Sequence, residues 1–182
     1  MNPPLVTLTG PPGSGKTTAG RGAAERLGLE FVSAGELFRA EAARRGVDLA
    51  TFSRMAEEDE GIDRALDQEM LSRARPGRLL EGRITGALCR RARIPSIDLV
   101  VTAREEVRVE RVARRDSLDL AAARSATQAR EGSERRRYLR IYGIDLDHER
   151  TDHMIDSSEL SPPQVVEEIV DFVRHASVSD RV

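Results

Sequence analysis

The chain has 182 residues, of which 39% are hydrophobic, 33% are charged and 3% are aromatic. Its net charge of -2 argues against a general nucleic-acid binder, since that class is usually strongly basic. A single cysteine, Cys89, excludes an intramolecular disulfide and a zinc site built on several cysteines. The N-terminus has no basic n-region, and the sequence has no run of roughly 18 apolar residues. We therefore expect a cytoplasmic protein without a signal peptide or membrane span.

The first predicted elements are a strand, a glycine-rich turn and a helix. Residues 5–9 (LVTLT) form a short β-branched apolar run, which is typical of a buried strand. Residues 16–28 (KTTAGRGAAERLG) predict a helix that ends at Gly28. Gly20 and Gly22 each cost such a helix about 1 kcal/mol relative to alanine. We therefore expect close packing at these two glycines.

The turn between that strand and that helix, GPPGSGKT from Gly10 to Thr17, fits the phosphate-binding pattern G-x-x-x-x-G-K-[ST]. Glycines allow successive backbone N–H groups to turn inward around phosphate oxygens, and the helix N-terminus adds positive potential. The motif predicts binding of ATP, with the Thr17 hydroxyl on Mg²⁺. The expected ATP-binding residues are Gly10, Pro11, Pro12, Gly13, Ser14, Gly15, Lys16, Thr17 and Thr18.

Lys16 is the only lysine among 29 basic residues, the other 28 being arginine. A compact ammonium reaches the β- and γ-phosphates inside the turn, whereas a bulkier planar guanidinium does not fit there in the same way. Because this lysine is the only one, the guanine-reading motif N-K-x-D of GTPases is excluded. Motor and AAA-type ATPases are normally larger, so the size favours a kinase that acts on a small acceptor.

The next segments predict a second strand, three helices and a third strand. Residues 29–32 read as a strand, and Ser33 with Glu36 forms a capping box that begins a helix. Two amphipathic helical patterns follow within residues 47–75, and residues 78–83 read as the third strand.

Two arginines and one carboxylate in these segments are candidate site residues. Arg39 lies one turn beyond the Ser33 cap, and Arg83 ends the third strand, where open parallel sheets bind ligands. Both are expected to bind a phosphate, because arginine does so bidentately. Glu81 either holds a water on Mg²⁺ or is paired with a nearby arginine.

The following segments predict a fourth strand at 97–103, a helix at 104–116 begun by a Thr102–Glu105 capping box, and a long helix at 119–142. Residues 104–140 carry eleven arginines, most of which would form surface ion pairs. Phosphoryl transfer nevertheless needs cations around the moving group, and a phosphate acceptor needs no general base.

Helical spacing places some of these side chains together. Arg111 and Arg115 share one face, as do Arg130 and Arg137, and Glu134 lies four residues from Arg130 and can orient it. Gly132 weakens this helix and is a candidate hinge for closure.

A fifth strand at 153–158 and a helix opened by Ser161–Gln164 complete the chain. Alternating strands and helices predict an α/β fold with three layers around a parallel five-stranded sheet. The helical blocks at 36–75 and 119–142 exceed what crossovers need, so we expect lobes standing over the sheet.

Taken together, these segments resemble the nucleoside monophosphate kinases, and most closely the short archaeal-type cytidylate kinases. The P-loop and SAGELFR are shared with adenylate kinases. The stretch from Arg130 to Asp147 and the acidic block within residues 56–67 are more specific. The matching segments span nearly the whole chain: GPPGSGKTT, VSAGELFR, FSRMAEEDEGIDRALD, LLEGR, ERVARRD and REGSERRRYLRIYGIDLD.

This resemblance implies one P-loop kinase domain over residues 1–182, with an acceptor-binding lobe at about 36–75 and an arginine-rich lid at about 116–142. The reaction would be phosphorylation of CMP or dCMP by ATP with Mg²⁺. The implied acceptor-phosphate residues are Arg39 and Arg83, beside Ser33 and Gly35. On the donor side, the resemblance implies that Arg111, Ser157 and Ser158 lie at the adenine. It implies that Arg115 contacts the ATP phosphates. Lys16, Arg115, Arg130 and Arg137 would stabilise the transferring group, with Glu134 placing the lid arginines.

The chain departs from the longer bacterial cytidylate kinases, which place an acid where this chain has Ile84. The cytosine contacts would then come from the acidic block, at Asp59, Asp63 or Asp67, with Asp63 as the expected substrate residue; alternatively the block is a solvated helix face. Rival functions are kinases of AMP, UMP or a hydroxyl-bearing metabolite, and an ATP-dependent RNA-associated protein. We expect nucleotide substrates as the partners, no specific nucleic acid, no membrane, and a monomer.

Overall fold

The computed structural model describes residues 3–179, which form five strands and eight helices. In chain order they are β1 (Val6–Thr9), α1 (Lys16–Leu27), β2 (Glu30–Ser33), α2 (Ala34–Arg44), α3 (Leu49–Glu58), α4 (Glu60–Ser72), β3 (Arg78–Glu81), α5 (Thr85–Arg91), β4 (Ile97–Thr102), α6 (Glu105–Asp116), α7 (Leu120–Tyr142), β5 (His153–Asp156) and α8 (Pro162–Ser179).

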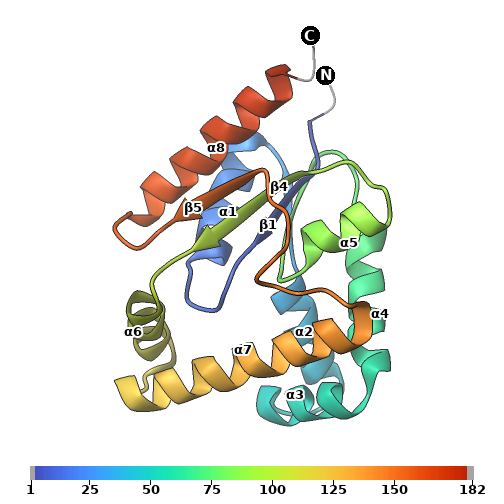
Figure 1. The fold of residues 1–182 in the computed structure, drawn as a ribbon, viewed down its shortest axis with the longest axis vertical. Helices are drawn as coiled ribbons and strands as arrows, with labels where there is room; N and C mark the ends of the chain where they lie inside the picture. The colour runs from blue at the N-terminus through green and yellow to red at the C-terminus, as the bar shows by residue number, and fades with distance from the viewer. Residues whose placement is uncertain (1–2, 180–182) are drawn as a thin grey trace.

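The five strands form one parallel sheet in the order β2-β3-β1-β4-β5. Helices α1 and α8 lie against one face of the sheet, and α5 lies on the other with α4 beside it (Figure 1). The expected three-layer α/β architecture is therefore confirmed. Because β1 is central and parallel to its neighbours, the turn that follows Thr9 opens beside the carboxyl ends of β3 and β4.

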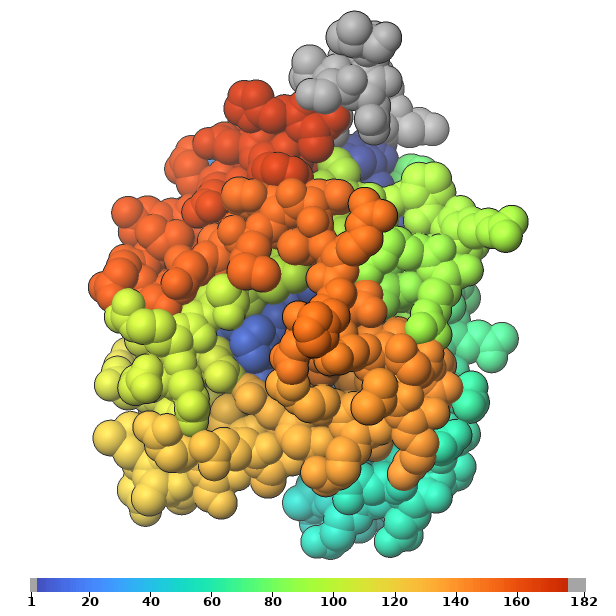
Figure 2. All heavy atoms as spheres, in the orientation of Figure 1, coloured from blue at the N-terminus to red at the C-terminus, as the bar shows by residue number. Residues whose placement is uncertain are grey.

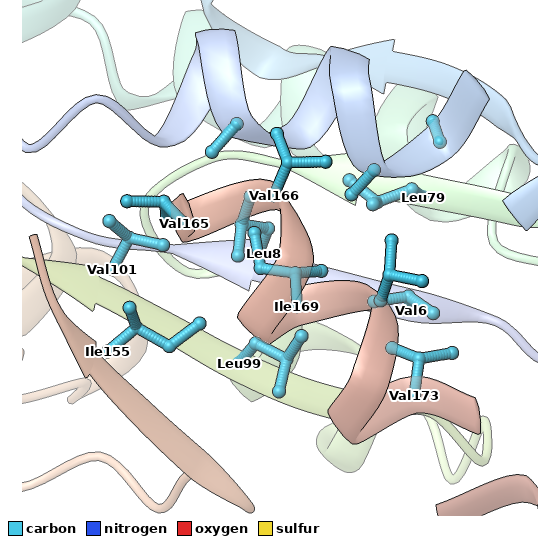
Figure 3. Close-up of a cluster of buried hydrophobic side chains, with 14 of the residues drawn as sticks. Val6, Leu8, Leu79, Leu99, Val101, Ile155, Val165, Val166, Ile169 and Val173 are labelled. Carbon is cyan, nitrogen blue, oxygen red and sulfur yellow. The ribbon is translucent and has the colours of Figure 1, made fainter. Parts of the chain in front are cut away.

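The main hydrophobic core lies between the sheet and the two helices α1 and α8. Figure 3 shows β1 and β4 side chains such as Leu8 and Leu99 facing Ile169 of α8, and all three are at most 1% exposed. The apolar face expected for the last helix is thus its core face. A Cβ on Gly20 would lie 2.8 Å from the Phe31 ring, and one on Gly22 would lie 2.8 Å from Val166 Cγ2. The predicted close packing at both glycines is confirmed.

Helix α5 is an element that the sequence did not predict. It has only seven residues, which is about two turns and too short for a helical period to stand out. Its side chains are nevertheless mostly buried, and Leu88 packs with Ile84 and Ile144 while Cys89 packs with Leu80. The structure adds a short helix directly after Arg83 and holds that arginine between β3 and α5.

Of the capping interactions predicted, one is wrong. Ser33 Oγ accepts the Glu36 N–H at 3.4 Å, as expected at the start of α2. The Thr102–Glu105 box does not form, because α6 begins with Arg104 as its N-cap residue and without a side-chain cap. The Arg104 N–H donates to Ser158 Oγ at 2.8 Å, so the β5–α8 turn holds the start of α6.

Helix α7 crosses the molecule below the sheet, from α6 at one end to α4 at the other (Figure 1). Asp119 caps its start by accepting the Ala122 N–H at 2.8 Å, and the helix continues unbroken through Gly132 to Tyr142. Ala123 is fully buried against apolar side chains of α6, and Tyr142 packs against the cluster at α5. No helix within residues 3–179 combines the length and the apolar character that crossing a membrane requires.

Candidate active site

The turn after β1 is shaped by three glycines. Gly10, Gly13 and Gly15 have φ values of +149°, +78° and +86°, a region that disfavours other residues. A Cβ on Gly10 would lie 2.0 Å from the Val101 carbonyl oxygen, and one on Gly13 would lie 2.5 Å from the Arg108 carbonyl oxygen. The backbone therefore follows a path that only glycine permits, and helix α1 begins directly behind it. This is the geometry of an anion-binding turn at a helix N-terminus.

Lys16 begins α1 and its ammonium lies close to the turn. Nζ lies 3.6 Å from Glu81 Oε1 and donates to the Pro11 carbonyl oxygen at 3.4 Å. Burial, and then the nearby Arg83 cation, lower the pKa of Lys16 to about 8. A bound polyphosphate would favour the charged ammonium, because it supplies the negative charge that this site lacks.

Glu81 is buried at the carboxyl end of β3. It accepts the Ser33 hydroxyl at 2.5 Å through Oε2 and faces Lys16 through Oε1. Among the described residues its charged partner is this lysine, so the expected alternative of an arginine partner is not what the structure shows. Thr17 lies beside Lys16, half-buried in the first turn of α1, and Thr18 is exposed.

Helix α7 brings Glu134 to the end of β3. The Glu134 carboxylate accepts Arg130 Nε at 2.9 Å, as its spacing predicted, and it also forms an ion pair with Arg83. Burial alone would raise the pKa of Glu134, but Arg83 and Arg130 outweigh it and lower the pKa to about 2. Arg83 also donates to the Gly10 carbonyl oxygen. The phosphate-binding turn, β3 and α7 are thus joined by charged groups.

A second ion pair joins α7 to α4, with Arg137 Nε 3.5 Å from Asp63 Oδ2. Arg137 Nη1 and Arg83 Nε are buried and have neither a hydrogen bond nor an ion pair within residues 3–179, whereas Arg137 Nε faces Asp63 and Arg83 Nη2 faces Glu134. Buried guanidinium nitrogens are normally satisfied, and a phosphate group is the ligand that accepts several of their hydrogens at once. The two arginines therefore form an incomplete site for an anion.

Arg111 and Ser157 lie together on the opposite side of the turn. Arg111 donates to Ser157 Oγ at 2.8 Å and to its carbonyl oxygen at 2.7 Å, and Ser157 Oγ donates to the Ser14 carbonyl oxygen at 2.8 Å. The two residues that the resemblance assigned to the adenine side are therefore in contact. Arg115, one turn later, is exposed and pairs with its neighbour Asp116.

Arg39 is exposed on α2 and has neither a hydrogen bond nor an ion pair with any residue in the part of the chain that the structure describes. A Cβ placed on Gly35 would lie 3.4 Å from Arg39 Nη1 and 3.6 Å from Ser33 Oγ, so the three residues expected at the acceptor phosphate are neighbours. Within residues 3–179, Arg39 is therefore a cation without a counter-charge.

The acidic block divides into three roles. Asp59 is the N-cap of α4 and accepts the Gly61 N–H at 2.8 Å. Asp63 faces Arg137, and Asp67 accepts the Tyr142 hydroxyl at 2.8 Å. Burial raises the pKa of Asp63, and it raises that of Asp67 to about 7. Asp63 and Asp67 therefore face α7, which is not what a solvated helix face would show.

Sequence reasoning missed Arg108, which is buried beneath the phosphate-binding turn. It lies three residues before Arg111 and so on nearly the same face of α6, but other arginines of this helix share such spacings, so the spacing does not single it out. Tyr142 was also missed, because its contact with Asp67 joins two helices and leaves no local pattern.

The site is open to one side of the molecule. In Figure 2, blue atoms of the N-terminal part of the chain lie at the floor of a hollow, bordered by α7 below and by the orange segment that follows it. A wider hollow of about 670 Å³ lies elsewhere, against β5 and α8. There the His153 ring stacks on the Phe172 ring, with centroids 4.6 Å apart. His153 Nε2 lies 3.1 Å from Glu168 Oε1, so these two side chains are already paired with each other.

Comparison with known proteins gives consistent matches. A family model described as an AAA domain matches residues 9–122. The cytidylate kinase of Archaeoglobus fulgidus is 39% identical over 171 residues, covering 92% of this chain and 93% of the relative. That of Pyrobaculum arsenaticum is 41% identical over 172 residues, covering 92% and 91%. A solved shikimate kinase from Acinetobacter baumannii, in complex with shikimate, has a TM-score of 0.61 at 23% identity over 99% of this chain and 96% of its own, a likeness of fold alone.

Proposed function

The chain belongs to the AAA-domain family and, within it, to the cytidylate kinases, and from this membership we propose its reaction and the role of each site residue. It is a nucleoside monophosphate kinase that transfers the γ-phosphoryl group of ATP to CMP; dCMP is the second candidate acceptor. An oxygen of the acceptor phosphate forms a bond to the γ-phosphorus while the bond to the β–γ bridging oxygen breaks, giving CDP and ADP. The acceptor oxygen is already anionic, so no side chain has to remove a proton.

The observation that carries this proposal is a pair of buried nitrogens without a partner, Arg83 Nε and Arg137 Nη1, with Arg83 close to the Lys16 ammonium. A turn that binds a triphosphate explains Lys16, but it leaves these two arginines unexplained. A second phosphate between the turn and α7 gives their N–H groups acceptors. Two phosphate-bearing substrates meeting end to end is what phosphate-to-phosphate transfer requires.

On the donor side, we assign the β- and γ-phosphates to the glycine turn and Lys16. Arg115, whose partner within residues 3–179 is its exposed neighbour Asp116, is free to reorient toward the same phosphates. Arg111 and Ser157 border the adenine, fixed by their mutual hydrogen bonds. These residues orient ATP so that its terminal phosphorus faces α7.

The Thr17 hydroxyl and the Glu81 carboxylate fit a Mg²⁺ site, because this ion prefers oxygen ligands. Thr17 lies in the first turn of α1, and Glu81 is paired in the sheet with Leu8 of β1, next to the start of the phosphate turn. Bound Mg²⁺ neutralises charge on the transferring phosphates. Ser33 holds Glu81 in place by donating to its second oxygen.

On the acceptor side, we assign the CMP phosphate to Arg39 and Arg83, with Arg130 and Arg137 bridging both phosphates as they approach. Glu134 fixes Arg83 and Arg130 at once, so it positions cations from two elements. Asp63 of α4 lies next to Arg137 of α7. For this reason we choose Asp63 among the three acidic candidates for contact with the cytosine. We further expect a cytoplasmic monomer that binds no specific nucleic acid.

The test is ADP release from ATP and Mg²⁺ with CMP, dCMP, UMP, AMP, GMP or no acceptor. We expect fast release with CMP or dCMP and only slow hydrolysis without an acceptor. Fast release with AMP or UMP alone would contradict the assignment of the acceptor. The likeness to shikimate kinase concerns the fold and adds no reason to expect a hydroxyl acceptor.

A further inference from the structure

Arg108 on α6 connects the phosphate-binding turn with α7. Its Nε donates to the Ala103 carbonyl oxygen at 3.1 Å, and its Nη1 donates to the Pro12 carbonyl oxygen at 3.3 Å. The same Nη1 forms an ion pair with the Glu131 carboxylate of α7. The Arg108 carbonyl oxygen also lies 2.5 Å from the position that a Cβ on Gly13 would occupy. One residue thus contacts the β4–α6 turn, the phosphate-binding turn and α7.

These contacts need an arginine and a carboxylate. The Arg108 side chain is 11% exposed, and a charge at that depth is costly unless it is paired and hydrogen-bonded. The planar guanidinium offers donors in several fixed directions, which suits acceptors on three different segments. A lysine ammonium is a point charge and would not hold all three in the same arrangement. Within residues 3–179, Glu131 is the counter-charge of this arginine.

The position of Glu131 on α7 gives the contact its consequence. Glu131 follows directly after Arg130, whose charge is close enough to Lys16 to lower that lysine's pKa. Fixing Glu131 against the turn fixes the rotation of α7 about its own axis. The rotation decides whether the neighbouring Arg130 side chain points toward the phosphates.

Other contacts between α6 and α7 do not reach the turn. Arg124 of α7 pairs with Glu105 of α6 at 2.8 Å, and both side chains are more than 40% exposed. That ion pair joins the same two helices as Arg108 and Glu131, but it lies on the solvent side. It is therefore a matched comparison for an α6–α7 ion pair with no connection to the site.

We propose that Arg108 is a positioning residue of the phosphoryl transfer, acting through Glu131 to set α7, and with it Arg130, over the phosphate-binding turn. Arg108 itself does not touch the transferring group. The inference rests on the proposed function, because Arg130 has its role there.

The test compares Glu131→Gln with Glu105→Gln in the intact chain. Displacing a catalytic group by about 1 Å costs up to about a hundredfold in rate. We expect Glu131→Gln to lower kcat for CMP phosphorylation by at least about tenfold, with the KM for ATP changed by less than about threefold. The melting temperature should fall, because Arg108 loses its counter-charge. Glu105→Gln should leave kcat within about twofold. Arg108→Lys should reproduce the loss seen with Glu131→Gln.

A double variant separates positioning from mere packing. If Glu131 acts through Arg130, adding Glu131→Gln to Arg130→Lys should lower kcat by less than about twofold more, because the arginine to be positioned is gone. A fully additive loss, or a Glu131→Gln enzyme with the kcat of the wild type, would overturn the inference. A wild-type protein that phosphorylates none of the acceptors would instead refute the proposed function, so the two failures are distinguishable.

Discussion

Asp63 of α4 and Arg137 of α7 form a buried ion pair, with Oδ2 and Nε 3.5 Å apart and both side chains at most 7% exposed. The pair joins the helical lobe of α2–α4 to the helix that crosses the site. Neither group is fully satisfied by the other, since Asp63 Oδ2 and two Arg137 nitrogens have no hydrogen-bond partner. The pair therefore keeps unused hydrogen-bonding capacity at the junction of α4 and α7.

The first prediction concerns Asp63→Asn, which keeps the size of the side chain and removes its charge. We expect the KM for CMP to rise about tenfold, because a lost hydrogen bond to a charged group costs about 1.5–3 kcal/mol. The KM for ATP should stay within about twofold, because Asp63 lies on the acceptor side. Initial rates with each substrate varied in turn measure both constants.

Asp59→Asn is the control for this prediction. Asp59 begins the same helix but serves as its N-cap, and asparagine caps equally well. Its KM for CMP should match that of the wild type. An unchanged KM for CMP in Asp63→Asn would show that the cytosine is recognised elsewhere.

The second prediction concerns Lys16→Arg, which keeps the charge. The ammonium lies within 3.6 Å of Glu81 and 3.4 Å of the Pro11 carbonyl oxygen, and a guanidinium is too wide for that space. We expect kcat to fall by at least about a hundredfold, because a donor aimed at the developing charge is worth about 2.7–4 kcal/mol. The melting temperature should change little.

The opposite exchange, Arg21→Lys, tests whether any change between arginine and lysine on α1 is harmful. Arg21 is exposed and pairs with Glu36, so the exchange should leave kcat within about twofold. A Lys16→Arg enzyme with normal kcat would contradict the role of the compact ammonium.

The third prediction concerns Gly132→Ala in the middle of α7. A Cβ there would lie 3.3 Å from Arg136 Nη1, the end of a flexible exposed side chain, so it fits after a small shift. Alanine favours the helix by about 0.5–1 kcal/mol relative to glycine. In a chain of this size, each kcal/mol of added stability raises the melting temperature by roughly 2–4 °C. If α7 bends at Gly132 during closure, the same change lowers kcat severalfold.

Calorimetry and steady-state rates measure the two effects of Gly132→Ala separately. A higher melting temperature with an unchanged kcat would mean that α7 does not bend at this residue. Gly22→Ala is the contrasting variant, since its Cβ would lie 2.8 Å from Val166 in the core and should lower the melting temperature.

The sequence predicted the sheet, the phosphate-binding turn and most helices because these features have local signals. The glycine motif carries its own geometry, and the apolar face of α8 is read directly from its spacing. Helix α5 was missed because seven residues, mostly buried, show no periodicity. The Thr102–Glu105 cap was wrong because Thr102 is the last residue of β4 and Arg104 takes the N-cap position of α6.

The candidate site was harder to predict, because its contacts join residues far apart in the chain. The Arg130–Glu134 pair follows from helical spacing, but the Arg83–Glu134 pair depends on how α7 crosses the sheet. Arg108 was hidden among many arginines whose burial the sequence does not reveal. Spacing finds pairs within a helix, whereas pairs between helices require the fold.

The fourth prediction concerns Asp67, whose carboxylate accepts the Tyr142 hydroxyl at 2.8 Å between α4 and α7. Burial raises its pKa from the ordinary 3.8 to about 7, although the Tyr142 hydrogen bond opposes the shift. A carboxyl with a raised pKa binds its proton more tightly in the folded protein than in the unfolded chain. Its stabilising contribution is therefore complete below about pH 4 and is lost as the pH rises through 7.

The variant Asp67→Asn lacks this titration, so its melting temperature relative to the wild type should increase between pH 5 and pH 8. A relative gain of about 1 kcal/mol corresponds to roughly 2–4 °C in a chain of this size. Glu134, with its pKa of about 2, contributes stability that is lost only as the pH falls from 4.5 toward 2, which is outside this window. The hydrogen bond to Asp145 raises the pKa of His148 in both proteins alike, so the difference between the two curves removes its effect.

Tyr142→Phe provides the second half of this test. Because the tyrosine hydroxyl stabilises the ionised carboxylate, its removal should raise the pKa of Asp67 further and shift the loss of stability to higher pH. Melting curves at half-unit steps of pH resolve this order: no loss for Asp67→Asn, loss through about pH 7 for the wild type, and a later loss for Tyr142→Phe. Parallel curves for all three proteins would mean that Asp67 stays ionised between the two helices, and its contact with Tyr142 would then be an ordinary carboxylate hydrogen bond.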